Sequence, residues 1–275
     1  SDGSYVIHSA LSIYENNKTD YVLDVLGGKD TNAATLCIWP KTGYSNQSFE
    51  LLTVAEAVAK FPTPQRNLPN GIDVSSWQPA DIGWRVDYDF MIVKATGATW
   101  YRNPNLSAQA SAALSRGKKL GLYHFAQESD TNNSAIAEAD WFISNIGSYL
   151  GKAVLFLDYE RDLPGTDSTW ITQFCQRVKA RTGISCQIYA SGNWAKNYIN
   201  GLWTQLGVWL WQANYSYGYA PFYGYNPTGT YMVTPQQGMM IHQYTSSGYL
   251  TGYSKALDLD VLYGSYADWD YRCKT

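Results

Sequence analysis

Two carboxylates stand one residue apart at the end of an apolar stretch. Residues 153–162 read AVLFLDYERD, so Asp158 and Glu160 follow five apolar residues. Because side chains alternate between the faces of a strand, the two acids are predicted to share a face. Carboxylates held close together push their pKa values apart, which leaves one protonated and one ionised. A proton donor beside an anion suits cleavage of a glycosidic bond; a solvated or ion-paired set of strand-end acids is the alternative.

Three further acids occupy comparable positions in other apolar segments. Asp73 lies in segment 71–77, and Asp258 and Asp260 share a face of segment 256–264 by the same alternation. If the first and last strands of a closed barrel adjoin, these acids meet Asp158 and Glu160 at one mouth. The pattern therefore predicts an acidic active site, on the assumption that the barrel closes.

Eight short apolar segments have the length and composition of strands. They span residues 71–77, 90–96, 119–126, 153–160, 185–191, 208–214, 239–245 and 256–264. Helical patterns separate the early strands, at residues 103–117, 133–147 and 169–183. After about residue 208 the spacers are rich in Gly, Pro, Ser and Tyr and show no helical period. We expect an α/β fold, namely an irregular TIM-like (β/α) barrel with fewer helices than strands.

The segment 61–70 is rich in proline and predicts a linker between two domains. Residues 71–275 would form the barrel. Residues 1–60 contain short apolar runs separated by polar turns, which predict a small all-β unit near the lower size limit for a stable core.

Composition excludes several classes of protein. The formal charge is −3 and the charges are scattered, so no basic face for nucleic acid is expected. No run of about eighteen apolar residues is present, so we expect no membrane insertion. No signal peptide is visible, and the start SDGSYVIHS is interpreted as processed or engineered. Aromatic residues make up 15% of the chain, and those in the Gly- and Pro-containing loop 215–225 suggest a sugar-binding rim.

Neither a metal nor a cofactor is expected. The three histidines, His8, His124 and His242, do not have zinc-ligand spacing, and His124 is interpreted as a hydrogen-bonded core residue. The four cysteines allow three pairings, of which a short bridge between Cys175 and Cys186 is one.

A series of motifs resembles glycoside hydrolase family 25, the Chalaropsis-type muramidases. The motifs follow in order between residues 71 and 264: GIDVSSWQ, IVKAT, LYHFA, DYE, IYAS, LWQANY and HQYTSSGYLTGYSKALDLDV. The resemblance implies a secreted or cell-wall-associated enzyme that cleaves the β-1,4 bond from N-acetylmuramic acid to N-acetylglucosamine in bacterial peptidoglycan.

The resemblance also implies roles for individual residues. Glu160 would be the general acid, and Asp158 would stabilise the cationic centre or orient the acetamido group. Asp73 and Asp258 would shape the charge of the cleft. Contacts with sugar are implied for Lys94, Tyr123, Tyr189, Trp211, Tyr215 and Gln243. The family often has an acidic residue and a glycine after K-A-T, where this chain has Gly97 and Ala98, so the surroundings of Lys94 differ.

Residues 4–52 resemble one lobe of a ricin-type β-trefoil lectin through VLDVLGG, LCIW and SNQSF. The resemblance implies sugar contacts at Asp24, Trp39, Asn46 and Gln47, whereas Cys37 stands where a polar ligand residue is common. A trefoil needs three lobes and one is present, so this lobe is either a fragment of a longer trefoil or packs on the barrel as structure; of the two we expect the structural role.

Two other functions fit parts of the pattern. A chitinase-like barrel would carry a further aspartate where this chain has Phe156. A carbohydrate-binding protein would keep the cleft without catalysis. Attack by the substrate's own acetamido group and attack by water are both open at this point, as is the oligomeric state.

Overall fold

The computed structural model describes residues 6–7, 21–25, 36–49, 68–128, 132–160, 167–215, 218–225 and 239–275. The chain divides into two compact units, Ser1–Gln65 and Arg66–Thr275. Most of the linker predicted at 61–70 lies outside the described residues. None of the helices in the described ranges is long and apolar enough to cross a membrane.

In the first unit, two short strands pair antiparallel. Strand β1 (Tyr21–Val25) pairs with β2 (Leu36–Pro40), and a 3-10 turn, η2 (Ser45–Gln47), follows. The register places Asp24 opposite Cys37 and Val22 opposite Trp39, so these four side chains share one face. Much of this unit lies outside the described residues, and the complete lectin-like lobe stays a prediction.

The second unit contains a ten-stranded sheet, most of which closes into a barrel. Its strands are β3 (Asn70–Val74), β4 (Phe90–Gly97), β5 (Tyr101–Arg102), β6 (Lys119–Phe125), β7 (Ala153–Asp158), β8 (Cys186–Ser191), β9 (Leu210–Ala213), β10 (Phe222–Tyr223), β11 (Met239–Tyr249) and β12 (Leu257–Leu262). Strands β5 and β10 are short additions paired with β4 and β11.

The remaining eight strands form the closed barrel. Strands β3, β4, β6, β7, β8 and β9 pair in parallel in that order, and β11 continues in parallel beside β9. Strand β12 then runs antiparallel to both β11 and β3 and closes the ring. The predicted irregular α/β barrel is confirmed, and its irregularity is the antiparallel β12.

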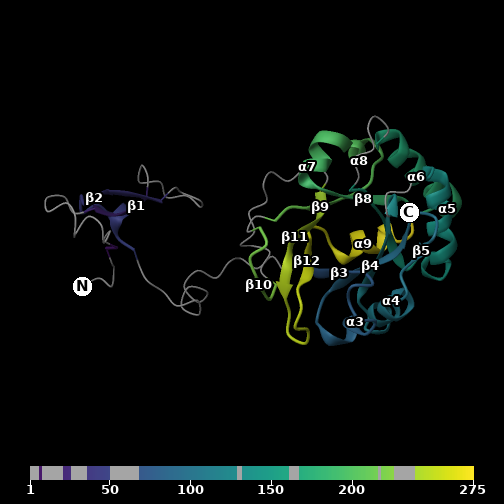
Figure 1. Cartoon of the computed structure of the whole chain (residues 1–275), viewed down its shortest axis with the longest axis horizontal. Coiled ribbons are helices and arrows are strands. Elements are labelled where there is room, and N and C mark those ends of the chain that lie inside the picture. Colours follow the sequence, from purple (N-terminus) through teal and green to yellow (C-terminus); the bar gives the residue numbers. More distant parts are fainter. Residues whose placement is uncertain are drawn as a thin grey trace. The chain divides into compact units, whose positions relative to one another are not determined.

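Helices cover much of the outside of the barrel (Figure 1). They are α3 (Ile82–Arg85), α4 (Leu106–Ser115), α5 (Ala135–Ile146), α6 (Asp167–Thr182), α7 (Gly192–Trp194), α8 (Leu202–Gln205) and α9 (Tyr266–Arg272), with the 3-10 turn η4 (Gly147–Tyr149) and the π-helical turn η5 (Ala195–Ile199). The three helices expected from the sequence correspond to α4, α5 and α6.

The inner face of α5 is formed by Ala135, Ala139, Phe142 and Ile146, which are buried, whereas Ile136 is 40% exposed. The terminal helix α9 was not predicted; it begins at a capping box between Ser265 and Asp268.

The core has two layers. Between strands and helices lies an aliphatic and aromatic layer, whereas the inside of the barrel is filled by aromatic rings, among them Phe90, Phe156, Trp211 and Trp269. Trp269 of α9 packs on Phe90, the first residue of β4, and donates to the carbonyl oxygen of Leu120 at 3.1 Å. Helix α9 therefore closes the amino-terminal end of the barrel, which leaves the carboxyl end as the open mouth.

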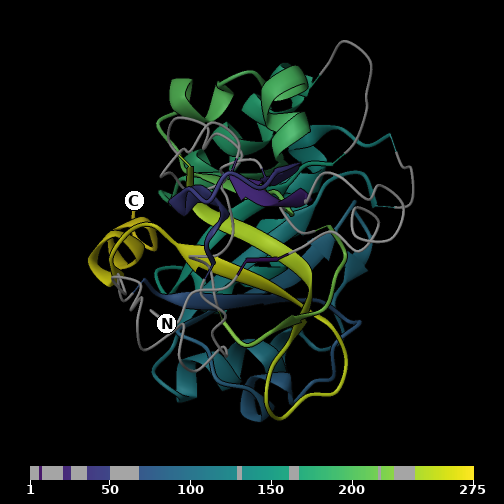
Figure 2. The same ribbon diagram turned by 90° about the vertical axis from the view of Figure 1, so that its left-hand side faces the viewer.

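The β11–β12 hairpin extends beyond the barrel, and its loop lies beside α3 (Figure 2). The four cysteines are all free thiols, so the bridge considered between Cys175 and Cys186 is not formed.

Candidate active site

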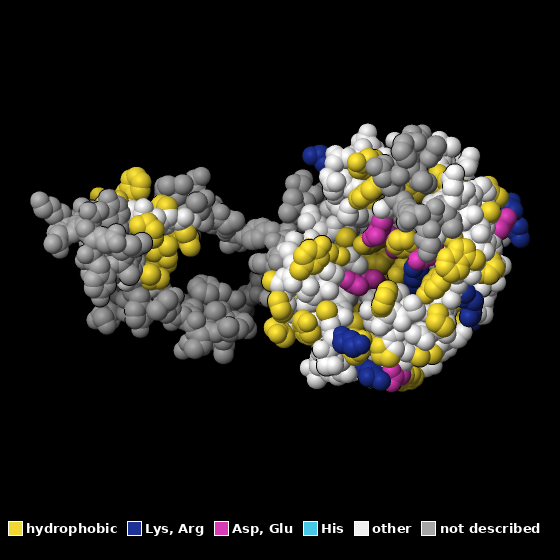
Figure 3. Space-filling model, viewed as in Figure 1, with side chains coloured by type: hydrophobic (Ala, Val, Ile, Leu, Met, Phe, Trp, Pro, Cys, Tyr) yellow, Lys and Arg dark blue, Asp and Glu magenta, His cyan; other side chains and the backbone are white. Residues whose placement is uncertain are grey.

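A hollow of about 280 Å³ opens at the carboxyl ends of the barrel strands. Acidic side chains gather around it on the face shown in Figure 3. Ten of the eleven residues predicted for the barrel site line this one hollow: Asp73, Lys94, Tyr123, Asp158, Glu160, Tyr189, Trp211, Tyr215, Gln243 and Asp258. Ser75, Trp77 and Phe125 line it as well and were not predicted.

The strands account for the placement of the acids. Asp158 is the last residue of β7, and Glu160 follows just beyond the strand end. Asp73 near the end of β3 is the register partner of Asp258 on the antiparallel β12. Paired residues of neighbouring strands project to the same side of a sheet, so barrel closure brings the first and last acidic segments together.

Gln243 of β11 links three side chains of the hollow. Its Nε2 donates to Oδ2 of Asp73 at 2.6 Å. Its Oε1 accepts from the hydroxyls of Tyr189 at 3.0 Å and Tyr215 at 2.7 Å. Since Gln243 is buried, these bonds fix the position of one acid and of two aromatic rings.

Asp260 lies below the hollow rather than in its lining. Its Oδ1 accepts from Nε1 of Trp211 at 2.8 Å, and the residue is fully buried. The Trp211 ring lies 4.4 Å from the Tyr189 ring, centroid to centroid. Asp258 therefore lines the hollow, whereas Asp260, predicted on the same face of the strand, lies beneath the hollow and supports the Trp211 ring.

The only described cation in the lining of this hollow is Lys94 of β4, and its partner comes from a different element. Its ammonium forms an ion pair with Glu128, which follows β6. The same ammonium lies 4.5 Å from the centroid of the Phe125 ring and 4.9 Å from that of Tyr101. Glu128 thus supplies the acidic partner of Lys94 that is absent from the positions directly after K-A-T. Glu128 was not predicted from the sequence.

Burial raises the pKa of every acid in the hollow, and repulsion by neighbouring carboxylates adds to the rise for Asp73, Asp158 and Asp258. Burial, followed by the charges of Asp258 and Asp260, holds the pKa of Asp73 well above its usual range. Burial and then the charge of Glu160 do the same for Asp158, which is 7% exposed. Burial also raises the pKa of Glu160, against a hydrogen bond from Tyr189 and the charge of Lys94. For Asp258, burial and the charge of Glu160 raise the pKa to about 7.

Asp158 and Glu160 differ in access to solvent. Asp158 is buried, and its Oδ1 has no hydrogen-bond partner among the described residues. Glu160 stands at the rim with an exposed side chain, although the protein around it still disfavours its charged form. A carboxyl that is both protonated and accessible can hand its proton to a bound molecule.

His124 lies away from this chemistry. Its Nδ1 contacts Oγ1 of Thr96 at 2.8 Å and its Nε2 contacts Oε2 of Glu138 at 2.9 Å, all three side chains being buried. Burial lowers the pKa of His124 and keeps the ring neutral. The interpretation of His124 as a hydrogen-bonded core residue is confirmed. Among the described residues, no group of three or more His, Cys, Asp or Glu side chains could hold a metal ion.

The four predicted lectin-like residues lie together in the first unit. Oδ2 of Asp24 accepts from Nε2 of Gln47 at 2.8 Å and from Nδ2 of Asn46 at 3.0 Å. Trp39 shares the face of Asp24 and is 54% exposed. The carboxylate of Asp24 is therefore engaged within the unit itself.

A barrel whose mouth holds paired, partly protonated carboxylates is an arrangement typical of glycoside hydrolases. A family model described as glycosyl hydrolases family 25 matches residues 72–253. The chain belongs to this family and is a glycoside hydrolase of the lysozyme type.

Known proteins resemble the chain over most of the barrel. Lysozyme M1 of Streptomyces globisporus is 30% identical over 215 residues, which cover 72% of this chain and 68% of that protein. The N,O-diacetylmuramidase of Arthroderma benhamiae is 30% identical over 168 residues, covering 52% of this chain and 69% of that protein. The crystal structure of the bacterial lysozyme from Streptomyces coelicolor matches with a TM-score of 0.57 and 29% identity, over 74% of this chain and 96% of that one.

Proposed function

We propose that this enzyme hydrolyses the β-1,4 bond from N-acetylmuramic acid to N-acetylglucosamine in bacterial peptidoglycan, with Glu160 as the general acid. The observation that carries the proposal is the convergence of Asp158 and Glu160 with Asp73 and Asp258 on one hollow. The family membership and the names of the relatives support peptidoglycan as the substrate.

Glu160 is proposed to donate its proton to the oxygen of the departing sugar. Its raised pKa keeps a larger fraction protonated near neutral pH, and its exposed side chain can reach a bound glycan. The anionic forms of Asp158 and its neighbours then stabilise the positive charge that develops at the anomeric carbon. Asp73 and Asp258 influence how far the other groups of the hollow are ionised, because Asp258 raises the pKa of Asp73 and both acids raise the pKa of Tyr123.

Aromatic side chains are proposed to hold the sugar rings. Tyr123, Tyr189 and Trp211 form the inner wall of the hollow, and Tyr215 stands nearer the surface. Their flat faces suit the apolar faces of pyranose rings, while the Tyr189 and Tyr215 hydroxyls are held by Gln243.

The structure favours a muramidase over a chitinase-like enzyme. In chitinase-like barrels a third acid stands two residues before the pair, and this position is Phe156. The Phe156 ring is fully buried and packs on Trp211 with centroids 5.4 Å apart. An acid there would be buried inside the aromatic core without a partner, which is costly.

The enzyme is proposed to act outside the cytoplasm, because its substrate is the cell-wall polymer. For the first unit we propose a structural role, since Gln47 and Asn46 already occupy the carboxylate of Asp24. Substitution of the exposed Trp39 by Ala should then leave the turnover of peptidoglycan unchanged; a marked loss would favour sugar binding by this unit.

Release of reducing ends from purified peptidoglycan tests the proposal. Wild-type protein should release them, and Glu160→Gln should lower kcat by about 10² to 10⁴ while still sedimenting with the insoluble polymer. A wild-type protein that binds peptidoglycan but releases nothing would establish a carbohydrate-binding protein instead. A matched control is Glu50→Gln, a carboxylate of the first unit.

A further inference from the structure

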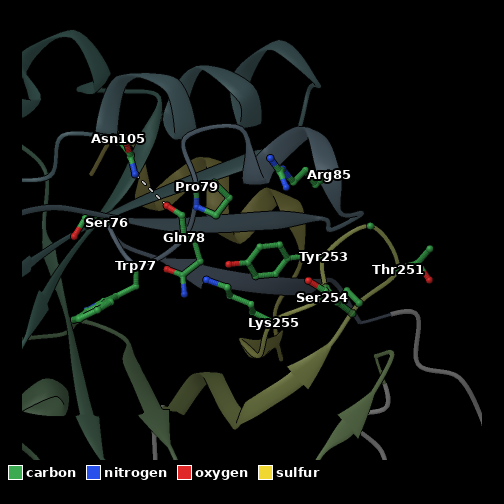
Figure 4. Close-up of a pocket in the computed structure, with 12 residues that line it drawn as sticks. Ser76, Trp77, Gln78, Pro79, Arg85, Asn105, Thr251, Tyr253, Ser254 and Lys255 are labelled. Atoms are coloured by element: carbon green, nitrogen blue, oxygen red, sulfur yellow. Dashed lines mark hydrogen bonds between the residues drawn. The ribbon is translucent and has the colours of Figure 1, made fainter.

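A second, larger hollow adjoins the acid-lined one (Figure 4). Its volume is about 810 Å³, and it lies between residues 76–79, which follow β3, and residues 250–255 of the β11–β12 loop. Trp77 lines both hollows and its side chain is 87% exposed. A polymer bound over the acids can therefore continue past the Trp77 ring into the second hollow.

Backbone contacts fix the walls of the second hollow. Gly252 has a φ of +100° and lies so close to α3 that a Cβ there would stand 1.9 Å from the carbonyl oxygen of Arg85. On the other wall, the Gln78 carbonyl accepts from Nδ2 of Asn105 at 3.0 Å, and its side-chain Oε1 accepts from the amide of Ser75 at 2.9 Å. The cavity is therefore formed before any ligand arrives, and such preorganisation favours binding.

The charge of the second hollow is opposite to that of the first. Arg85 is neutralised by Asp81 through two hydrogen bonds of 2.8 and 2.9 Å. Lys255 has no ion pair among the described residues and points along the Tyr253 ring toward Gln78 (Figure 4). The engaged Oε1 of Gln78 leaves its Nε2 as a donor beside the Lys255 ammonium. An anion is the ligand that such donors recognise.

We propose that this hollow binds the anionic peptide attached to the glycan, an inference that rests on the proposed function. In peptidoglycan the muramic acid carries a peptide with free carboxylates through its lactyl group. The acid-lined hollow repels such carboxylates, whereas the Lys255 ammonium and the Gln78 amide attract them. Trp77 separates the two sites, so the sugar chain occupies the first hollow and the peptide enters the second.

Binding to a turnover-deficient protein tests the assignment. In the Glu160→Gln background, calorimetry compares a soluble tetrasaccharide of alternating N-acetylglucosamine and N-acetylmuramic acid with the same tetrasaccharide carrying its peptides. The peptide-bearing form should bind roughly tenfold more tightly, as expected for one charge-assisted hydrogen bond. Lys255→Gln should abolish this preference and leave the affinity for the bare tetrasaccharide unchanged.

The matched control is Lys152→Gln, an exposed lysine before β7, at the opposite end of the barrel; it should keep the preference. Equal affinity of the parent protein for both tetrasaccharides would overturn the inference. An equal loss of affinity for the bare and the peptide-bearing tetrasaccharide in Lys255→Gln would also overturn it, because the hollow would then bind sugar. Failure of the proposed function is a separate result, namely no release of reducing ends from bare glycan by the wild-type protein.

Discussion

Gly97 and Glu128 lie so close together that position 97 has no room for a side chain. A Cβ at Gly97 would stand 2.5 Å from Oε2 and 2.9 Å from Cβ of Glu128. The missing side chain admits the Glu128 carboxylate, which pairs with Lys94 at the wall of the acid-lined hollow. Strand β4 thus supplies the cation and the space, and the segment after β6 supplies the anion.

The first prediction concerns this ion pair. Lys94 lowers the pKa of Asp158, and Glu128 raises it. Glu128→Gln removes the raising charge, so the pKa of Asp158 falls and the acid limb of kcat/KM against pH moves to lower pH. Gly97→Ala should move the limb in the same direction, because its methyl group displaces Glu128. The measurement is the rate of reducing-end release by wild type and both variants across the pH range. An acid limb that stays in place or moves to higher pH in both variants would contradict this role of Glu128.

Asp258 gives a prediction for stability. Its pKa is about 7 in the folded protein, chiefly because of burial, and about 3.9 in an unfolded chain. Between these values the folded form binds more protons, so the free energy of unfolding falls as the pH rises through that window. The Asp258→Asn variant does not lose this stability, because an asparagine side chain does not titrate. Its Tm relative to wild type should therefore be higher at about pH 8 than at about pH 4, by roughly 5 °C.

Thermal unfolding of both proteins at the two pH values checks this. The same difference at both would mean that Asp258 has an ordinary pKa in the folded protein.

Gln243 should matter for stability as well as for the shape of the site. Gln243→Leu leaves the buried carboxylate of Asp73 and the hydroxyls of Tyr189 and Tyr215 without this partner. Each unsatisfied group costs about 1–3 kcal/mol, so a loss of roughly 3 kcal/mol in the free energy of unfolding is expected. Tyr215→Phe, which removes one of these bonds, should lose about 1 kcal/mol. Denaturant titration gives both values, and equal losses would argue against a shared network.

His124 provides a contrast, because its role is confined to the core. His124→Gln disrupts the contacts to Thr96 and Glu138 and should lower the free energy of unfolding by about 1–3 kcal/mol. The pH dependence of turnover by the folded variant should match that of wild type. A stable variant with an altered pH profile would give His124 a part in catalysis.

The sequence predicts the acids well because two regular patterns locate them. Alternation along a strand gives the side on which Asp158 and Asp258 project. Parallel strands place the carboxyl ends of β3 and β7 at one edge, and Asp258 reaches the same edge near the start of β12 because that strand runs antiparallel. The pairing of Asp73 with Asp258 needed one further assumption, barrel closure, which the register of β12 with β3 confirms.

Residues on loops were missed for a physical reason. Trp77 and Glu128 follow the ends of β3 and β6, where no periodicity fixes the direction of a side chain. Their places depend on contacts that no periodic pattern encodes: the ion pair with Lys94 for Glu128, and a turn in which the backbone amide of Trp77 donates to Oγ of Ser75 at 3.2 Å. The short helix α9 was missed because a single turn or two of helix has little period to detect.

Mass spectrometry of digested peptidoglycan identifies both the bond that is cleaved and the part of Glu160 in its cleavage. Purified peptidoglycan is digested with wild-type protein or Glu160→Gln, reduced with borohydride, and the soluble fragments are identified. With Glu160 as the general acid of a muramidase, the wild type should give disaccharide-peptides with reduced muramic acid ends, and the variant should give them at a rate lower by about 10² to 10⁴. Reduced glucosamine ends from the wild type, or the same products from Glu160→Gln at a comparable rate, would contradict this assignment.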